Sequence, residues 1–167
     1  MREFFHKGRI YTKDVNSEKE LQISFCVDES TYIIPDPDSG EALILSASSE
    51  GWGRYQKPGY KYIQWSFDEC SLDEEKEALK SMHGAKYIES YPDITCNGLK
   101  GSALLFHNKN TQGLHCLIPV GDGIYLNIGV YCVSFDNTKE LREIKDFCKT
   151  DIVKRIFDTI RIENTTN

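Results

Sequence analysis

Two histidines on a predicted β-hairpin are the residues whose spacing could support metal chemistry. His107 ends one apolar segment and His115 lies in the next, with a polar stretch between them. If the connecting loop spans residues 108–114, the imidazoles lie opposite each other across the strands, with Cβ atoms about 5 Å apart. Such a pair supplies half of a zinc or copper site. No spaced carboxylate or thiol completes the set, and a shift of one residue in register would separate the histidines onto opposite faces.

The remaining chemistry-bearing residues lack the patterns that catalysis requires. The sequence has neither a Gly-x-Ser-x-Gly nucleophile elbow nor a glycine-rich phosphate loop. His115 and Cys116 are neighbours, and neighbouring side chains of a strand point to opposite faces, so they cannot form a nucleophilic pair. The sequence therefore favours a non-enzymatic protein, with no catalytic residue and no cofactor. The carboxylates weighed as an acid–base pair all fall in turns or at helix caps: Asp93, Asp122, Asp136 and Asp146.

A glycine-rich loop over residues 51–60 is the first candidate surface for a partner. It combines large aromatic side chains with an arginine, and these residue types are the usual anchors of protein interfaces. A loop that packs onto its own sheet is the alternative interpretation. The predicted partner-binding residues of this loop are Trp52, Arg54, Tyr55 and Tyr60.

One face of the strand predicted at residues 124–134 is the second candidate surface. Apolar residues alternate with Tyr125, Asn127 and Tyr131, and Gly129 leaves a gap among them. This face could hold a ligand or the edge of a partner, unless a helix covers it. The residues predicted to contribute are Tyr125, Asn127 and Tyr131, together with Tyr60, Tyr62 and Gln64 of the strand predicted at 60–67.

Apolar and polar residues alternate with a period of two over most of the chain on either side of residues 72–82, and this alternation is typical of strands. Residues 87–88 are expected as a short strand and residues 90–98 as a loop. The other predicted strands are 8–14, 20–27, 31–34, 42–47, 60–67, 102–107, 113–119 and 124–134.

Helical periodicity appears in two blocks. Ser71 followed by Glu74 is a capping-box pattern and predicts a helix near residues 72–82. A second helix is predicted near residues 138–161, with a possible break at residues 149–150. Strands in runs and helices in two blocks predict an α+β fold, a mostly antiparallel sheet with both helices packed on it. The length of 167 residues fits a single globular domain over residues 1–167. The apolar stripe of the first helix is formed by Leu72, Leu79 and Met82.

Three segments of the C-terminal half follow a characteristic order: GSALLF at 101–106, GIYLNIG at 123–129 and IFDTIRI at 156–162. This order of meander strands and final helix resembles the Mog1/PsbP-like α/β/α sandwich group. The resemblance implies a sandwich fold and a binding role rather than catalysis. Members of the group include small-GTPase binders, photosystem accessory proteins and lipoproteins, and the resemblance carries no shared catalytic residues.

Charge and composition exclude several classes of partner. The net charge is −6 and no Lys/Arg cluster is present, so we expect no nucleic-acid binding. No segment approaches the roughly 20 apolar residues of a membrane span. Residues 1–10 have no apolar core of signal-peptide length, and none of the six cysteines forms a C-x-x-C pair, which favours reduced thiols and a cytoplasmic protein.

The sequence thus predicts a small cytoplasmic module that binds a protein partner, with no signal of its oligomeric state. Two alternatives stay open. One is a metal-binding protein or enzyme centred on His107 and His115. The other is a secreted or lipoprotein-type domain whose leader has been removed.

Overall fold

The computed structural model describes residues 2–11, 16–27, 32–35, 42–45, 59–121, 123–136 and 138–164 of the chain. Ten strands and three helices lie in these segments. The strands are β1 Arg2–Tyr11, β2 Asn16–Val27, β3 Tyr32–Pro35, β4 Ala42–Leu45, β5 Lys61–Asp68, β6 Tyr87–Cys96, β7 Leu99–His107, β8 Thr111–Gly121, β9 Ile124–Val133 and β10 Arg161–Asn164. The helices are α1 Leu72–Ser81, α2 Arg142–Cys148 and α3 Asp151–Thr159.

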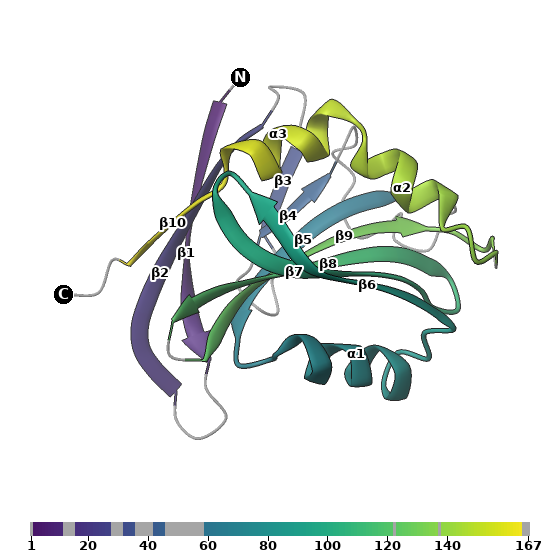
Figure 1. The fold of residues 1–167 in the computed structure, drawn as a ribbon. Coiled ribbons are helices and arrows are strands. Elements are labelled where there is room, and N and C mark those ends of the chain that lie inside the picture. Colours follow the sequence, from purple (N-terminus) through teal and green to yellow (C-terminus); the bar gives the residue numbers. More distant parts are fainter. Residues whose placement is uncertain are drawn as a thin grey trace.

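The strands form a seven-stranded sheet, ordered β3–β4–β5–β9–β8–β7–β6, and a three-stranded sheet, ordered β1–β2–β10. All their pairings are antiparallel. Helix α1 lies on one face of the large sheet, and α2 and α3 lie over the other (Figure 1). The small sheet contacts β5 through β1 and α3 through β2. The predicted α+β class, a mostly antiparallel sheet with helices packed on it, is confirmed.

Alternation along the strands sends side chains to both faces of the large sheet, where the described residues form three apolar clusters, the smallest of them around Tyr60, Tyr62 and Val133. The largest cluster joins β2, β5 and β9 to α2 and α3, and an edge contact between Phe25 and Trp65, with ring centroids 5.3 Å apart, links the two sheets. The remaining cluster packs Leu79 of α1 on Leu104 and Phe106 of β7. Fully burying one such large side chain contributes about 1.5–3 kcal/mol to stability.

The first predicted helix is confirmed as α1. Ser71 is its N-cap and accepts a hydrogen bond from the Glu74 amide at 3.3 Å. Met82 departs from the prediction, because its side chain is 77% exposed and does not join the apolar stripe. It is the C-cap, directly after the last helical residue.

The second predicted helix, near residues 138–161, is present as two helices, α2 and α3, with the break at residues 149–150 that the sequence allowed. Leu141 has a left-handed backbone (φ +49°), so the helix begins only at the next residue. It breaks between α2 and α3, where the Thr150 hydroxyl donates to the Phe147 carbonyl at 2.6 Å. The segment also ends early, because Ile160 is extended and leads into β10.

A loop was expected at residues 90–98, but β6 continues through most of this stretch as a ten-residue strand. A bulge between Tyr91 and Ile94 interrupts its pairing with β7. Pro92 lies at this bulge, and proline is tolerated there because β6 is an edge strand with one side unpaired. The polar, exposed residues that resembled a loop are those of a protected sheet edge.

The predicted pairing of His107 with His115 is wrong. The hairpin turns over residues 108–110, where the Asn108 amide donates to the Thr111 carbonyl at 2.9 Å. His107 therefore pairs with Gln112, and His115 pairs with Leu104. The two imidazoles lie on opposite faces of the sheet, because His115 is three positions from the partner of His107.

Candidate functional site

The structure brings together the tyrosines of the predicted sheet surface, whereas Trp52, Arg54 and Tyr55 lie outside the described residues. Tyr62 pairs with Tyr131 across β5 and β9, and their rings stack with centroids 4.7 Å apart. Tyr60 follows on the same side, 5.8 Å from Tyr62. Tyr125 and Asn127 lie farther along this face of β9 and are half-buried.

The gap expected at Gly129 is filled from within the chain. Gly129 is the cross-strand partner of His115, and the ring of Tyr131 leans over it, where any β-carbon would stand. The Tyr131 hydroxyl thereby reaches His115 Nε2 and shares a hydrogen bond with it at 2.6 Å. A glycine at this position is required for that close approach.

A row of hydrogen-bonded polar side chains connects α1 to the sheet at this point, formed by Tyr131, His115, Glu75 and Cys70. His115 Nδ1 and Glu75 Oε1 lie 2.6 Å apart, and the other carboxylate oxygen accepts a hydrogen bond from the Cys70 thiol at 3.2 Å. Glu75 and His115 are 9% and 8% exposed. Buried polar groups that find such partners fix one arrangement of the surrounding elements.

Electrostatics set the protonation states of this row. Burial alone would raise the pKa of Glu75, but the hydrogen bond and charge of His115 outweigh it and hold the pKa below its ordinary value of 4.5. Glu75 is therefore ionised at neutral pH, and a carboxylate can only accept, so His115 Nδ1 carries the proton. The neighbouring acid differs: burial raises the pKa of Asp68, and the charge of Glu75 adds to the shift.

Cys70 is not an activated nucleophile. Burial, together with its hydrogen bond to Glu75, raises the pKa of its thiol to about 12. A reactive cysteine needs the opposite, a thiolate favoured by neighbouring positive charge. The row can hold and orient protons, but it does not generate a thiolate.

A cavity of about 170 Å³ opens beside this row, and we call it the His115 pocket. It is roofed by the end of α1 and floored by the sheet. Its hydrogen-bonding side chains come mainly from the sheet and the β7–β8 hairpin. Its lining residues are Tyr62, Gln64, Leu79, His83, Phe106, Asn108, Thr111, His115 and Tyr131.

The other predicted metal ligand, His107, is on the α2 side. It is 1% exposed, and neither ring nitrogen has a hydrogen-bond partner among the described residues. Burial, reinforced by the charge of Lys86, lowers the pKa of His107 below its ordinary value of 6.5. The described segments contain no group of three His, Cys, Asp or Glu side chains arranged to hold a metal ion.

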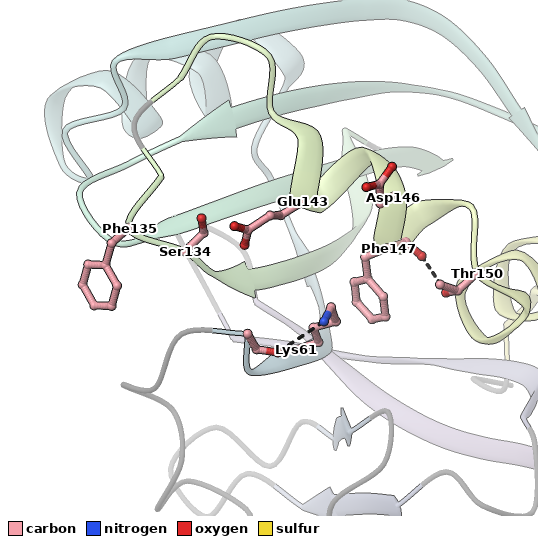
Figure 2. A pocket seen from close by; sticks show the side chains of 8 residues that line it. Lys61, Ser134, Phe135, Glu143, Asp146, Phe147 and Thr150 are labelled. Carbon is pink, nitrogen blue, oxygen red and sulfur yellow. Dashed lines mark hydrogen bonds between the residues drawn. The ribbon is translucent and has the colours of Figure 1, made fainter.

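A larger cavity of about 710 Å³ lies between α2 and the ends of β5 and β9, and we call it the α2 groove (Figure 2). Phe147 forms a buried wall, and the Lys61 ammonium lies 5.8 Å from the centre of its ring. Phe135 projects at the opposite side and is 58% exposed. The residues lining the α2 groove are Gly59, Lys61, Ser134, Phe135, Glu143, Asp146, Phe147 and Thr150.

A side chain of β8 supports the helix that forms this wall. Gln112 is fully buried, and its carbonyl oxygen accepts a hydrogen bond from the Ile144 amide at 3.1 Å. Its amide group donates to the Ser134 hydroxyl at 3.4 Å. The first turn of a helix has unpaired amides, and α2 lacks a side-chain N-cap, so Gln112 takes that role from another element.

Two of these residues were missed in the sequence. Glu75 lies three residues after Leu72 and four before Leu79, which places it on the apolar stripe of the predicted helix. A carboxylate on such a stripe is a signal of a buried polar contact. Gln112 gave no comparable signal, because it lies in the polar stretch that resembled a loop.

Comparisons with known proteins show the fold but no family. No protein-family model matches the sequence, and a search of curated proteins finds no match. A solved structure with a similar fold is LpqN, described as involved in cell envelope biogenesis of Mycobacterium tuberculosis. The TM-score is 0.53 at 10% sequence identity, and the match covers 95% of this chain and 91% of that chain. No described helix is both long and apolar enough to cross a membrane.

Proposed function

We propose that this protein is a non-enzymatic module that binds a protein partner at the α2 groove. The observation that carries this proposal is Phe135, a large aromatic side chain that is 58% exposed at the rim of a cavity of about 710 Å³. Aromatic side chains beside a concave, partly apolar surface are the usual anchors of protein interfaces. Phe147 provides the apolar wall against which a partner's side chain can pack.

Charge favours a partner segment that pairs an apolar side chain with a lysine or arginine. Glu143 and Asp146 line the α2 groove and are solvent-exposed, and Lys61 is the one cation among its described lining residues. The net charge of −6 extends this preference to the whole chain. Complementary charge of this kind speeds association and selects among partners more than it adds affinity.

The test compares capture of a partner from a native-host extract by the wild-type chain and by two variants. Phe135→Ala is expected to weaken binding of the identified partner about tenfold or more, as for an interface anchor. Met82→Ala is the matched control, because it truncates another exposed apolar side chain, 77% exposed and on the α1 side of the sheet. Equal binding by all three proteins would rule out the α2 groove as the interface.

A charge reversal provides an independent arm of the same experiment. Glu143→Lys is expected to slow association with a basic partner and to reduce its dependence on salt. An association rate that stays the same, or rises, would contradict the assigned partner chemistry. The predicted loop contacts are tested in parallel with the double variant Trp52→Ala and Tyr55→Ala, because capture that survives both changes would remove the loop from the interface.

A second candidate role is that of an exported, envelope-associated domain. The similarity of fold to LpqN is compatible with it, as is the proposed membership of the Mog1/PsbP-like group. The cytoplasmic alternative is supported by the cysteines, all six of which are free thiols, three of them buried. Titration of unfolded protein from the native host distinguishes the two: six reactive thiols support the cytoplasm, and oxidised pairs support export.

A further inference from the structure

We propose that the His115 pocket binds one small, neutral molecule rich in hydroxyl groups, of the size of a single sugar ring. The pocket lies on the α1 side of the large sheet, whereas the α2 groove lies by the helix on the opposite face. The two sites share no lining residue. This inference therefore stands independently of the proposed partner binding.

The size of the pocket selects the class of ligand. Its volume of about 170 Å³ is below the roughly 300–1,000 Å³ of cavities that hold drug-sized molecules. The pocket volume equals that of about five or six water molecules at ~30 Å³ each. One six-membered ring with its substituents fills such a space, whereas a nucleotide or a peptide segment does not fit.

The charge of the lining selects a neutral ligand. Gln64, Asn108 and Thr111 place amide and hydroxyl groups on the lining. The Thr111 hydroxyl donates to Asn110 Oδ1 at 3.2 Å and the Asn108 carbonyl oxygen accepts from the Asn110 amide at 3.4 Å, but a hydroxyl can also accept and a side-chain amide can also donate. Among the described residues, no carboxylate and no ammonium group lines the pocket, and its groups that titrate near neutral pH are two imidazoles, the solvent-exposed His83 and the buried His115. Glu75 lies behind His115, so any charge on that imidazole is matched inside the protein. An ionic ligand would lose its hydration without gaining an opposite charge, which is strongly unfavourable.

The aromatic wall suits the apolar faces of a sugar ring. Tyr62 and Tyr131 stack with centroids 4.7 Å apart, and Phe106 meets His115 edge-on at 4.9 Å. Small-molecule sites combine such apolar walls with a few placed polar groups. A hydroxylated ring presents C–H groups on its faces and hydroxyl groups at its edge, which matches that combination.

The polar row behind the pocket holds its wall in place before a ligand arrives. His115 is fixed by Glu75 at 2.6 Å, and Tyr131 is fixed by His115 at the same distance. The hydroxyl of Tyr131 is thus oriented without any contribution from the ligand. Preorganised groups of this kind strengthen binding because less freedom is lost on association.

The experiment is an ¹H–¹⁵N NMR titration of the full chain with four neutral probes: D-glucose, D-galactose, N-acetyl-D-glucosamine and myo-inositol. A ligand of this size is expected to bind with a dissociation constant in the millimolar range. We expect the amide signals of Gln64, Thr111 and Tyr131 to shift with at least one probe. Glucosamine and glucose 6-phosphate, which carry opposite charges, are expected to bind about tenfold more weakly or not at all.

Two variants assign the effect to the pocket. Gln64→Met and Thr111→Val keep the size of the side chain and remove its hydrogen bonds, and each is expected to weaken binding about two- to tenfold. Ser66→Ala is the control, because Ser66 lies on the same face of β5 but outside the lining. Unchanged spectra outside the pocket establish that each variant is folded.

Any one of the following results would overturn the proposal. One is that no neutral probe shifts the pocket amides at concentrations well above the millimolar range. Another is that the shifts map to a different surface, or that the charged probes bind as tightly as the neutral ones. The third is that both pocket variants bind the best probe as well as Ser66→Ala does.

Discussion

Replacing Glu75 with alanine removes the anionic partner of a buried histidine and should destabilise the protein by about 3 kcal/mol. The change deletes the 2.6 Å contact with His115 and the 3.2 Å hydrogen bond from Cys70. Each buried hydrogen-bonding group left without its partner costs about 1–3 kcal/mol, and here two donors lose their acceptor, the imidazole of His115 and the thiol of Cys70. The lower part of the combined range applies, because the Glu75 and His115 side chains keep 11% and 10% of their exposure to water. Alanine is itself a good helix former, so helix propensity does not add to the loss.

The measurement is thermal and urea unfolding of the two matched variants Glu75→Ala and Glu77→Ala. Glu77 is on the same helix with its side chain 75% exposed, so its removal should change stability by no more than about 0.5 kcal/mol. For a chain of this length, a loss of about 3 kcal/mol lowers the melting temperature by about 6–12 °C. The reasoning is refuted if the two variants melt within a degree or two of each other.

The contact between Glu75 and His115 should also make the free energy of unfolding depend on pH. The pKa of Glu75 is lowered in the folded protein, so its ionised carboxylate contributes stability above the ordinary pKa of 4.5, and this stability is lost as pH falls through the lower folded value. Wild-type protein should therefore lose stability with acid more steeply than Glu75→Ala. If the curves of unfolding free energy against pH below 5 were parallel for wild-type protein and Glu75→Ala, the ionised form of Glu75 would not be stabilised by its partners.

Three further predictions follow from individual residues. Gly129→Ala places a methyl group where the Tyr131 ring lies, so we expect a loss of about 1–3 kcal/mol and an altered Tyr131 environment in near-UV circular dichroism; an unchanged spectrum and stability would argue against that packing. The lowered pKa of His107 means that the unfolded chain binds its proton first, so stability should fall as pH drops below 6.5, and His107→Leu should flatten this part of the curve. Burial raises the pKa of the Cys132 thiol to about 12, and Cys70 has a similar value, so neither should react with a thiol reagent at pH 8 until the protein unfolds. Rapid labelling of either in the native protein would contradict that assignment.

The sequence predicted best where a single rule decides the structure. The alternation along residues 124–134 identified β9 and the face on which Tyr131 lies, because a period of two leaves no freedom in side-chain direction. Ser71 identified the start of α1, because the cap hydrogen bond is local to the chain. Both signals need no knowledge of distant segments.

The predictions from sequence failed where contacts with distant segments of the chain determine the structure. The register of the β7–β8 hairpin depends on Thr111 and Gln112, which are polar and resembled a loop. Gln112 is buried in the strand because its partners, Ser134 and the Ile144 amide, are supplied by the segment after β9 and by α2. The candidate site depended on this register, since it decides that His115 meets Glu75 rather than His107. No local pattern contains that information.

The pairing of β10 with β2 has a consequence for folding during synthesis. The Cys26 amide donates a hydrogen bond at 2.8 Å to the Thr159 hydroxyl, which lies 133 residues later, just before β10 joins β2. While the protein is being synthesised, one edge of β2 has no native neighbour until residues 161–164 have left the ribosome. Long-range pairing of this kind is slow, and an uncovered strand edge invites association between chains. Truncation before Arg161, or slowed translation of the last segment, is therefore expected to cause aggregation through residues 16–27, and chaperone binding to that strand would protect the nascent protein.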